Sequence, residues 1–205
     1  MAALAQNPAQ ENPVHETILY TPANLSVFAT NRTAHFSVDF THGGYGNFSF
    51  AGGVSNFSNG SGHSTFYQSQ VDWRGSALNH RLVKGMEIGP GENFQGEGLM
   101  AEYVHSYHRT RDLKPAHSSC FGRFLAANFY MGVRFQVKGE THYGWIRFSS
   151  MKCYPVLGTI TGYAYNMVPN APIQAGQTRS GEAQSSQVAA DRSLGQLALG
   201  SAGRN

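Results

Sequence analysis

The sequence of 205 residues is poor in charged side chains and has no long apolar run. Asp, Glu, Lys and Arg make up 13% of it, about half the share in an average globular protein. The net charge of +3 is mild and the basic residues form no cluster, so we expect neither nucleic acid nor an anionic membrane surface as a partner. No stretch approaches the roughly 18 apolar residues that a membrane-spanning helix needs, so we expect no membrane span.

Motifs for catalysis are also missing. There is no Gly-x-Ser-x-Gly elbow to hold a serine nucleophile, and the glutamates lie mostly in turn-like sequence. We therefore expect a protein that is not an enzyme, with no catalytic residues and no cofactor.

One run of residues resembles a set of metal ligands. Glu102, His105 and His108 share a face if residues 99–108 form a helix, but the two histidines point to opposite sides if that segment is a strand. The sequence is ambiguous between helix and strand here, and it offers no evident fourth ligand. We expect incidental polar side chains and no metal site.

What the sequence does contain is glycine, aromatic residues and alternating apolar positions. It has 24 glycines, and 12% of its residues are aromatic, a composition typical of all-β proteins. Over residues 129–137 the apolar side chains fall on alternate positions, which is the period of a half-buried strand and not of a helix. Residues 143–148 and 33–40 follow the same rule. The apolar residues that we expect to be buried together are Val133, Phe135, Ile146 and Phe148.

The runs at 129–137 and 143–148 predict a hairpin that turns at Gly139 and Glu140. Glycine at the first central position suits a type II′ turn, which needs a positive φ. This register places Val133 opposite Ile146, so that the apolar face of one strand pairs with the apolar face of the other.

The chain has only two cysteines, Cys120 and Cys153. In the register above, Cys153 falls opposite Ala126, about 20 Å of strand away from Cys120 at roughly 3.3 Å per residue. A disulfide needs Cα atoms within about 7 Å, which only a sharp bend at residues 118–122 would provide. We therefore expect two buried free thiols.

The β pattern predicts an all-β fold, with one antiparallel β-sandwich or jelly-roll-like domain over residues 17–178. Residues 1–16 are polar and are expected to form an extended N-terminal arm. Residues 179–205 comprise a Ser/Gln-rich linker and a C-terminal arm. We expect this arm to dock on a β-sandwich through its large apolar side chains, Leu194, Leu197 and Leu199.

Three segments resemble the recurring endings of a known group of proteins: KGETHYGWIRFS at 138–149, TITGYAYNMVPNAPIQAGQT at 159–178 and SLGQLALGSAG at 193–203. The group is a large set of uncharacterised secreted proteins that abound in Acidobacteria and related soil bacteria. GMEIGPGENF at 85–94 resembles another of their motifs, and the resemblance covers about 81–203 well and 33–80 loosely. It implies secretion and a β-sandwich, and it implies no activity. We accordingly expect a secreted or cell-surface protein, with the signal peptide absent from this chain.

Proteins of this set often carry an acidic, glycine-containing loop near the second or third strand that suits a cation. The matching stretch here, residues 39–48, keeps only Asp39 and Asn47 as oxygen ligands. Because calcium takes about six to eight oxygens, we expect no calcium site.

These observations favour a non-enzymatic structural protein that associates with itself through its terminal arms, as a filament or matrix subunit. The alternative is an extracellular carbohydrate-binding module for a polysaccharide. An exposed sheet face that stacks on sugar rings would then consist of Tyr143, Trp145, Tyr163 and Tyr165. The competing interpretation of these four residues is that their face packs on a second sheet.

Overall fold

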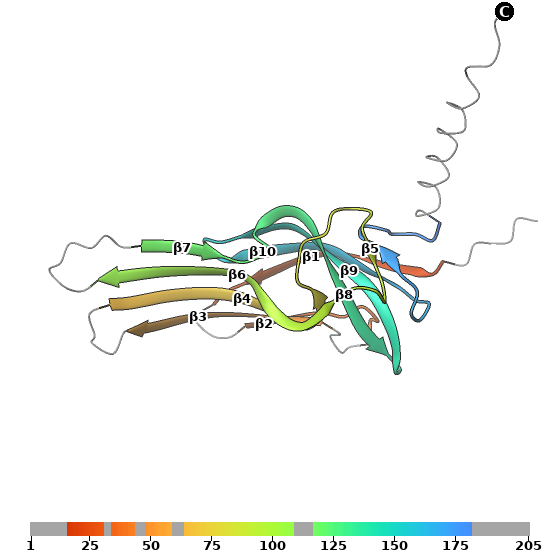
Figure 1. Cartoon of the computed structure of the whole chain (residues 1–205), viewed down its shortest axis with the longest axis horizontal. Helices are drawn as coiled ribbons and strands as arrows, with labels where there is room; N and C mark the ends of the chain where they lie inside the picture. Colours follow the sequence, from red (N-terminus) through yellow and green to blue (C-terminus); the bar gives the residue numbers. More distant parts are fainter. Residues whose placement is uncertain (1–15, 31–33, 44–47, 59–63, 109–116, 182–205) are drawn as a thin grey trace, which may run out of the picture.

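The computed structural model describes residues 16–30, 34–43, 48–58, 64–108 and 117–181 (Figure 1). These residues form eleven strands and no helix, and the strand pairs are antiparallel, so the prediction of an all-β antiparallel domain is confirmed. The part of the chain that the structure describes offers no long apolar helix that could cross a membrane. The strands are β1 (Ile18–Phe28), β2 (Ala34–Val38), β3 (Phe48–Ser58), β4 (Ser64–Leu78), β5 (Glu87–Ile88), β6 (Phe94–His108), β7 (His117–Phe121), β8 (Ala126–Val137), β9 (Glu140–Lys152), β10 (Leu157–Asn166) and β11 (Ile173–Gln174).

Nine of these strands make one sheet, in the order β1-β10-β9-β8-β4-β3-β2, with β6 paired to β4 and β7 paired to β6. The sheet curls until its ends approach each other, because the ring of Phe28 in β1 lies 5.1 Å from the ring of Phe36 in β2. At the same place β1 packs so closely on β3 that a Cβ atom on Gly52 would overlap the carbonyl oxygen of Phe28. The sheet therefore has an enclosed inner face and an outer face. The remaining strands, β5 and β11, form a small second sheet.

The inner face holds the main core. Alternate side chains of the long strands meet there, and the rings of Phe129 and Phe148 stack with their centroids 5.0 Å apart. Val133, Phe135, Ile146 and Phe148 all belong to this core, which confirms the prediction that they are buried together.

A second core lies on the outer face of β8, β9 and β10. The small β5–β11 sheet covers this face, with Ile88 and Ile173 packed in the same cluster as Trp145. The indole Nε1 of Trp145 donates a 3.1 Å hydrogen bond to the carbonyl of Gln177, just after β11. This half of the sheet is therefore buried on both faces.

The hairpin between β8 and β9 turns one residue earlier than predicted. Its central residues are Lys138 and Gly139, with φ angles of 51° and 87°. Two successive positive φ angles are those of a type I′ turn, so the predicted type II′ turn is wrong. As a result Val133 lies opposite Gly144 and not opposite Ile146. The register differs by two residues, which leaves every side chain on its predicted face.

Cys120 and Cys153 form a disulfide with their Cα atoms 5.9 Å apart, so the expectation of two free thiols is wrong. The chain bends after β7 at Gly122, whose φ of 133° favours glycine. This bend lays β7 beside β6, where Cys120 pairs with Tyr103. The straight path from β7 into β8 that the expectation assumed is therefore absent.

The two ends of the described domain meet. Thr17 donates its amide to the Ser180 hydroxyl at 2.6 Å, and the Glu16 carboxylate accepts from the Ser180 hydroxyl and amide, each at 2.7 Å. The Ser180 hydroxyl, aided by the Ile18 amide, holds the pKa of Glu16 below its ordinary value. The points at which the expected arms join the domain thus lie side by side. Most of both arms, including Leu194, Leu197 and Leu199, lies outside the described residues.

Candidate functional site

The structure separates the four aromatic residues that were expected to share an exposed sheet face. All are buried, with exposed fractions of 3% for Tyr143, 1% for Trp145 and 8% for both Tyr163 and Tyr165. Tyr143 and Trp145 belong to the outer core, whereas Tyr163 and Tyr165 belong to the inner core. Burial raises the pKa of both Tyr163 and Tyr165. The predicted sugar-stacking face is therefore wrong, because packed segments cover both faces of β9 and β10.

Four strands continue beyond the core at one end of the molecule. β4 pairs with β8 only at Ser76 and Ala77, but it pairs with β6 over most of its length. The other half of β4 therefore runs on with β3, β6 and β7, toward the left in Figure 1. We call this region the extension, and define it as residues 53–58, 65–70, 102–106 and 117–121.

An open pocket of about 300 Å³ lies on the inner face of the extension, lined by Tyr67, Tyr103, His105 and Tyr154. We call it the aromatic pocket. Tyr67 pairs with His105 across β4 and β6, and Tyr103 lies two residues along on the same face. Tyr154 comes from the loop after β9, and its ring centroid lies 4.7 Å from that of Tyr103. The Tyr154 side chain is 72% exposed, so its ring is available to a ligand.

Hydrogen bonds order the polar side of the aromatic pocket. The Ser118 hydroxyl lies 2.6 Å from Nδ1 of His105 and 3.2 Å from the hydroxyl of Tyr103. The Cys120–Cys153 disulfide anchors the segment that carries Tyr154. The pocket therefore combines fixed ring faces with hydroxyl groups and one imidazole, which suits a ligand with an apolar face and a polar rim.

The outer face of the extension carries polar side chains that bond to one another. The Gln68 amide donates to Gln70 at 2.9 Å and also to Glu102, and the Gln70 amide donates to Asp72 at 2.7 Å. This polar ladder uses most of its own donors and acceptors, so few of them remain for a ligand.

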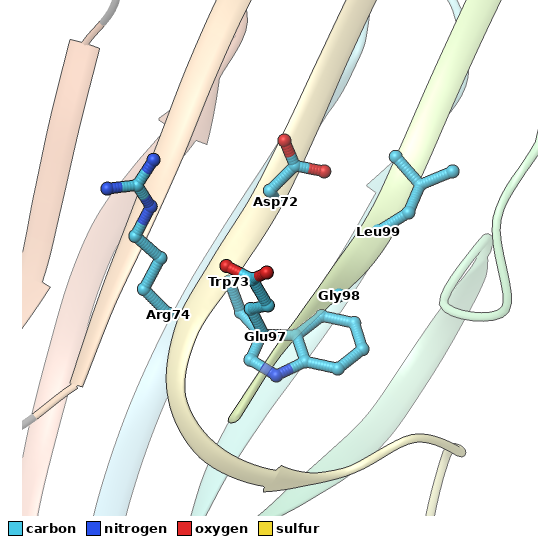
Figure 2. A pocket seen from close by; sticks show the side chains of 6 residues that line it. All are labelled: Asp72, Trp73, Arg74, Glu97, Gly98 and Leu99. Carbon is cyan, nitrogen blue, oxygen red and sulfur yellow. The ribbon is translucent and has the colours of Figure 1, made fainter. Parts of the chain in front are cut away.

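A hollow of about 280 Å³ lies at the end of the ladder, on the outer face (Figure 2). Asp72 and Arg74 line it from β4, and Glu97 lines it from β6, opposite Arg74. Burial raises the pKa of the Asp72 carboxyl. Trp73 also lines the hollow but is fully buried, so no ring of these residues is offered to a ligand. Charged side chains therefore line the hollow, whereas three tyrosines and one histidine line the aromatic pocket.

The described residues among those considered as metal ligands do not converge. Residues 99–108 belong to β6, and strand geometry places Glu102 on the outer face and His105 on the inner face. Asp39 accepts hydrogen bonds from the amide and hydroxyl of the residue two positions later, each at 3.0 Å. The His108 side chain and Asn47 lie outside the described part of the chain. Among the described residues, no three His, Cys, Asp or Glu side chains form a group that could hold a metal ion.

Sequence reasoning missed the aromatic pocket because its residues come from three distant segments. A signal for it was present in β4 and β6. At the inner positions of β4, the buried Trp73 and Val71 give way to Ser69, Tyr67 and Thr65. Such a change from apolar to aromatic and hydroxyl side chains, on a face that was apolar, indicates that the strand has left the core.

No family model, curated protein or solved structure matches this chain. The aromatic pocket offers an exposed ring, hydroxyl groups and an imidazole beside the Cys120–Cys153 disulfide.

Proposed function

We propose that this protein is an extracellular, non-enzymatic carbohydrate-binding domain and that the aromatic pocket is its sugar-binding site. The observation that carries the proposal is the Tyr154 ring, which is 72% exposed and lies beside Tyr103 in an open pocket. The disulfide at the preceding residue and the neighbouring Tyr103 ring hold the Tyr154 side chain in its exposed position. An exposed ring beside a second ring and several polar groups supplies the stacking surface that a sugar needs.

The chemistry of a sugar matches both parts of the pocket. A pyranose ring has a face of C–H groups that packs on an aromatic ring and a rim of hydroxyl groups that forms hydrogen bonds. Tyr154 and Tyr103 supply the ring surface. Tyr67, His105 and Ser118 supply donors and acceptors around it. Neither part alone distinguishes a sugar from an apolar or a purely polar ligand.

The test is a screen of the full chain against a panel of oligosaccharides, followed by calorimetric titration of the tightest one. We expect Tyr154→Ala to weaken binding about tenfold, because the stacking surface is lost. Phe57→Ala is the matched control, since Phe57 is a ring of the same extension that is 49% exposed and stacks on Phe66 on the outer face. It should bind as the wild type does. Binding of no glycan by the wild type, or equal affinity in Tyr154→Ala, would overturn the proposal.

A structural role through self-association is the second candidate. The observation that favours it is the contact between Glu16, Thr17 and Ser180, which brings the attachment points of both arms together. These points lie at the start of β1, and the aromatic pocket lies beyond the other end of that strand, about 35 Å away at roughly 3.3 Å per residue. The attachment points of the arms and the aromatic pocket therefore lie toward opposite ends of β1.

A further inference from the structure

We infer that the sugar site extends beyond the aromatic pocket into a row across four strands, and that its ligand is an uncharged glycan chain laid across those strands. This inference rests on the proposed function and adds to it the length and the charge of the ligand. Two observations support it. The strand register aligns side chains of neighbouring strands across the extension, and the charged side chains lie on its outer face and not at the described positions of its inner face.

The register places four side chains in one row. Asn56 in β3 pairs with Tyr67 in β4, Tyr67 pairs with His105 in β6, and His105 pairs with Ser118 in β7. Cross-strand partners share a face, so all four side chains project from the inner face. Three steps between neighbouring strands, at about 4.8 Å each, give a row of about 14 Å. Such a row is longer than one sugar ring and suits an oligosaccharide.

The row is open at both ends among the described residues. β2 pairs with β3 only as far as Gly52, so the edge of β3 beside Asn56 has no described neighbour. β7 pairs with β6 alone, so the row also ends at an edge beside Ser118. A chain that crosses the strands can therefore continue past either edge, and the site suits an internal stretch of a polymer.

The inner face of the extension is almost free of charge. Its described positions include no Asp, Glu, Lys or Arg. Glu102, the one carboxylate of the extension, and Asp72 and Arg74 just beyond it belong to the outer face. At these described positions a charged ligand would find no counter-charge to replace its hydration, whereas hydroxyl groups would find hydrogen-bond partners. The inner-face positions of the extension are Val54, Asn56, Ser58, Thr65, Tyr67, Ser69, Tyr103, His105, Ser118 and Cys120.

The test uses the full chain and matched neutral probes, the dimers and hexamers of cello-, laminari-, xylo- and manno-oligosaccharides, with oligogalacturonate as the anionic probe and chitosan oligomer as the cationic one. We expect a neutral hexamer to bind more tightly than its dimer. Asn56→Ala should weaken the hexamer about three- to tenfold, as expected for one or two lost hydrogen bonds, and leave the dimer unchanged. Ser55→Ala is the control, because Ser55 lies next in sequence but on the outer face. Affinity should change less than about twofold between roughly 0.02 M and 0.5 M NaCl.

Different results overturn different parts. If Tyr154→Ala abolishes binding of both lengths while Asn56→Ala changes neither, the extended row is wrong and the proposed function stands. If the galacturonate or chitosan probe binds more tightly than every neutral hexamer, or if binding collapses with salt, the uncharged assignment is wrong. If no probe binds the wild type, the inference and the proposed function fall together. Equal melting temperatures of wild type, Asn56→Ala and Ser55→Ala establish that a lost affinity is not a lost fold.

Discussion

The ring of Tyr154 lies 4.7 Å from the ring of Tyr103, although one belongs to the loop after β9 and the other to β6. Each ring neighbours one half of the same cross-link. Cys153 directly precedes Tyr154, and Cys120 is the strand partner of Tyr103. The disulfide thus holds the two rings of the candidate sugar site in one geometry.

Replacing both cysteines with serine is expected to affect stability and binding together. The free energy of unfolding should fall by about 2–4 kcal/mol, because the unfolded chain regains the freedom of the closed loop. Glycan affinity should also fall, because Tyr154 is no longer held beside Tyr103. Denaturant titration and calorimetry measure the two effects, and mild reduction of the wild type is the control that should reproduce both. Unchanged affinity at a temperature where the variant is folded would show that the disulfide has no part in the site.

Closure of the sheet is tested by two neighbouring glycines. A Cβ atom on Gly52 would overlap the carbonyl oxygen of Phe28, whereas a Cβ atom on Gly53 would meet nothing within 4 Å. Gly52→Ala should lower the free energy of unfolding by about 3 kcal/mol, because backbone cannot move aside as a side chain can. Gly53→Ala, the control, should leave stability unchanged or raise it by up to about 1 kcal/mol. Equal stability of the two variants, measured in urea, would contradict the close packing of β1 on β3.

Asp72 gives a prediction on pH. Burial raises the pKa of its carboxyl above the ordinary value of 3.8, so the folded protein binds this proton more tightly than the unfolded chain does. Stability therefore falls as the pH rises through the interval between the unfolded and the folded pKa. Asp72→Asn keeps an acceptor for Gln70 and removes the charge. It should be more stable than the wild type at neutral pH, by less than about 1 kcal/mol because solvent screens a half-exposed site.

The control for this variant is the same comparison in acid. Near pH 3 both proteins are neutral at position 72, so the difference in the free energy of unfolding should vanish. If Asp72→Asn is less stable than the wild type at pH 7, the ionised Asp72 carboxylate stabilises the folded protein and the prediction is wrong.

Phe135 tests the inner core. It is 7% exposed and stacks on Phe40 with a centroid distance of 4.6 Å. Phe135→Ala should lower the free energy of unfolding by about 3–5 kcal/mol, because it removes a buried ring and leaves a cavity. Gln136→Ala, at the next and exposed position, should change it by less than about 0.5 kcal/mol. A thermal melt that does not distinguish the two variants would refute the assignment of faces in β8.

Truncation after Gly181 tests self-association while it keeps the contact between Ser180 and Glu16. If the C-terminal arm joins subunits, the full chain sediments as an assembly and the truncated chain as a monomer, because a head-to-tail contact need not close. Equal sedimentation of both chains counts against the structural role. In that case a lowered melting temperature of the truncated chain indicates that the arm packs on its own domain.

Alternation in the sequence was sufficient to predict the strands of the hairpin and the burial of Val133, Phe135, Ile146 and Phe148. It was not sufficient to predict register. A slip of two residues leaves every side chain on its face, so the alternating pattern is equally satisfied by both registers. The turn decides between them, and the type I′ turn at Lys138 and Gly139 lacks the Asn-Gly or Asp-Gly pair that usually marks it.

Events distant in the chain account for the remaining errors. The burial of Tyr143 and Trp145 depends on β5 and β11, two-residue strands from separate segments whose pairing no local pattern reveals. The disulfide depends on the bend at Gly122, which lets β7 pair with β6 rather than run straight into β8. The aromatic pocket depends on that disulfide. The errors in the predicted site therefore result from contacts between segments that are distant in the sequence, and not from wrongly predicted strands.

β4 is one continuous strand in two environments. Its inner-facing Val71 and Trp73 belong to the core, and Tyr67, further along the same face, lines the pocket. If the aromatic pocket binds a glycan as proposed, the proximal half of β4 serves the core and its distal half serves recognition. Substitutions at the distal half can therefore alter which ligand is selected while the melting temperature stays where the proximal half sets it. In a lineage of such chains, specificity would diversify at the tip of the sheet without any compensating change in the core.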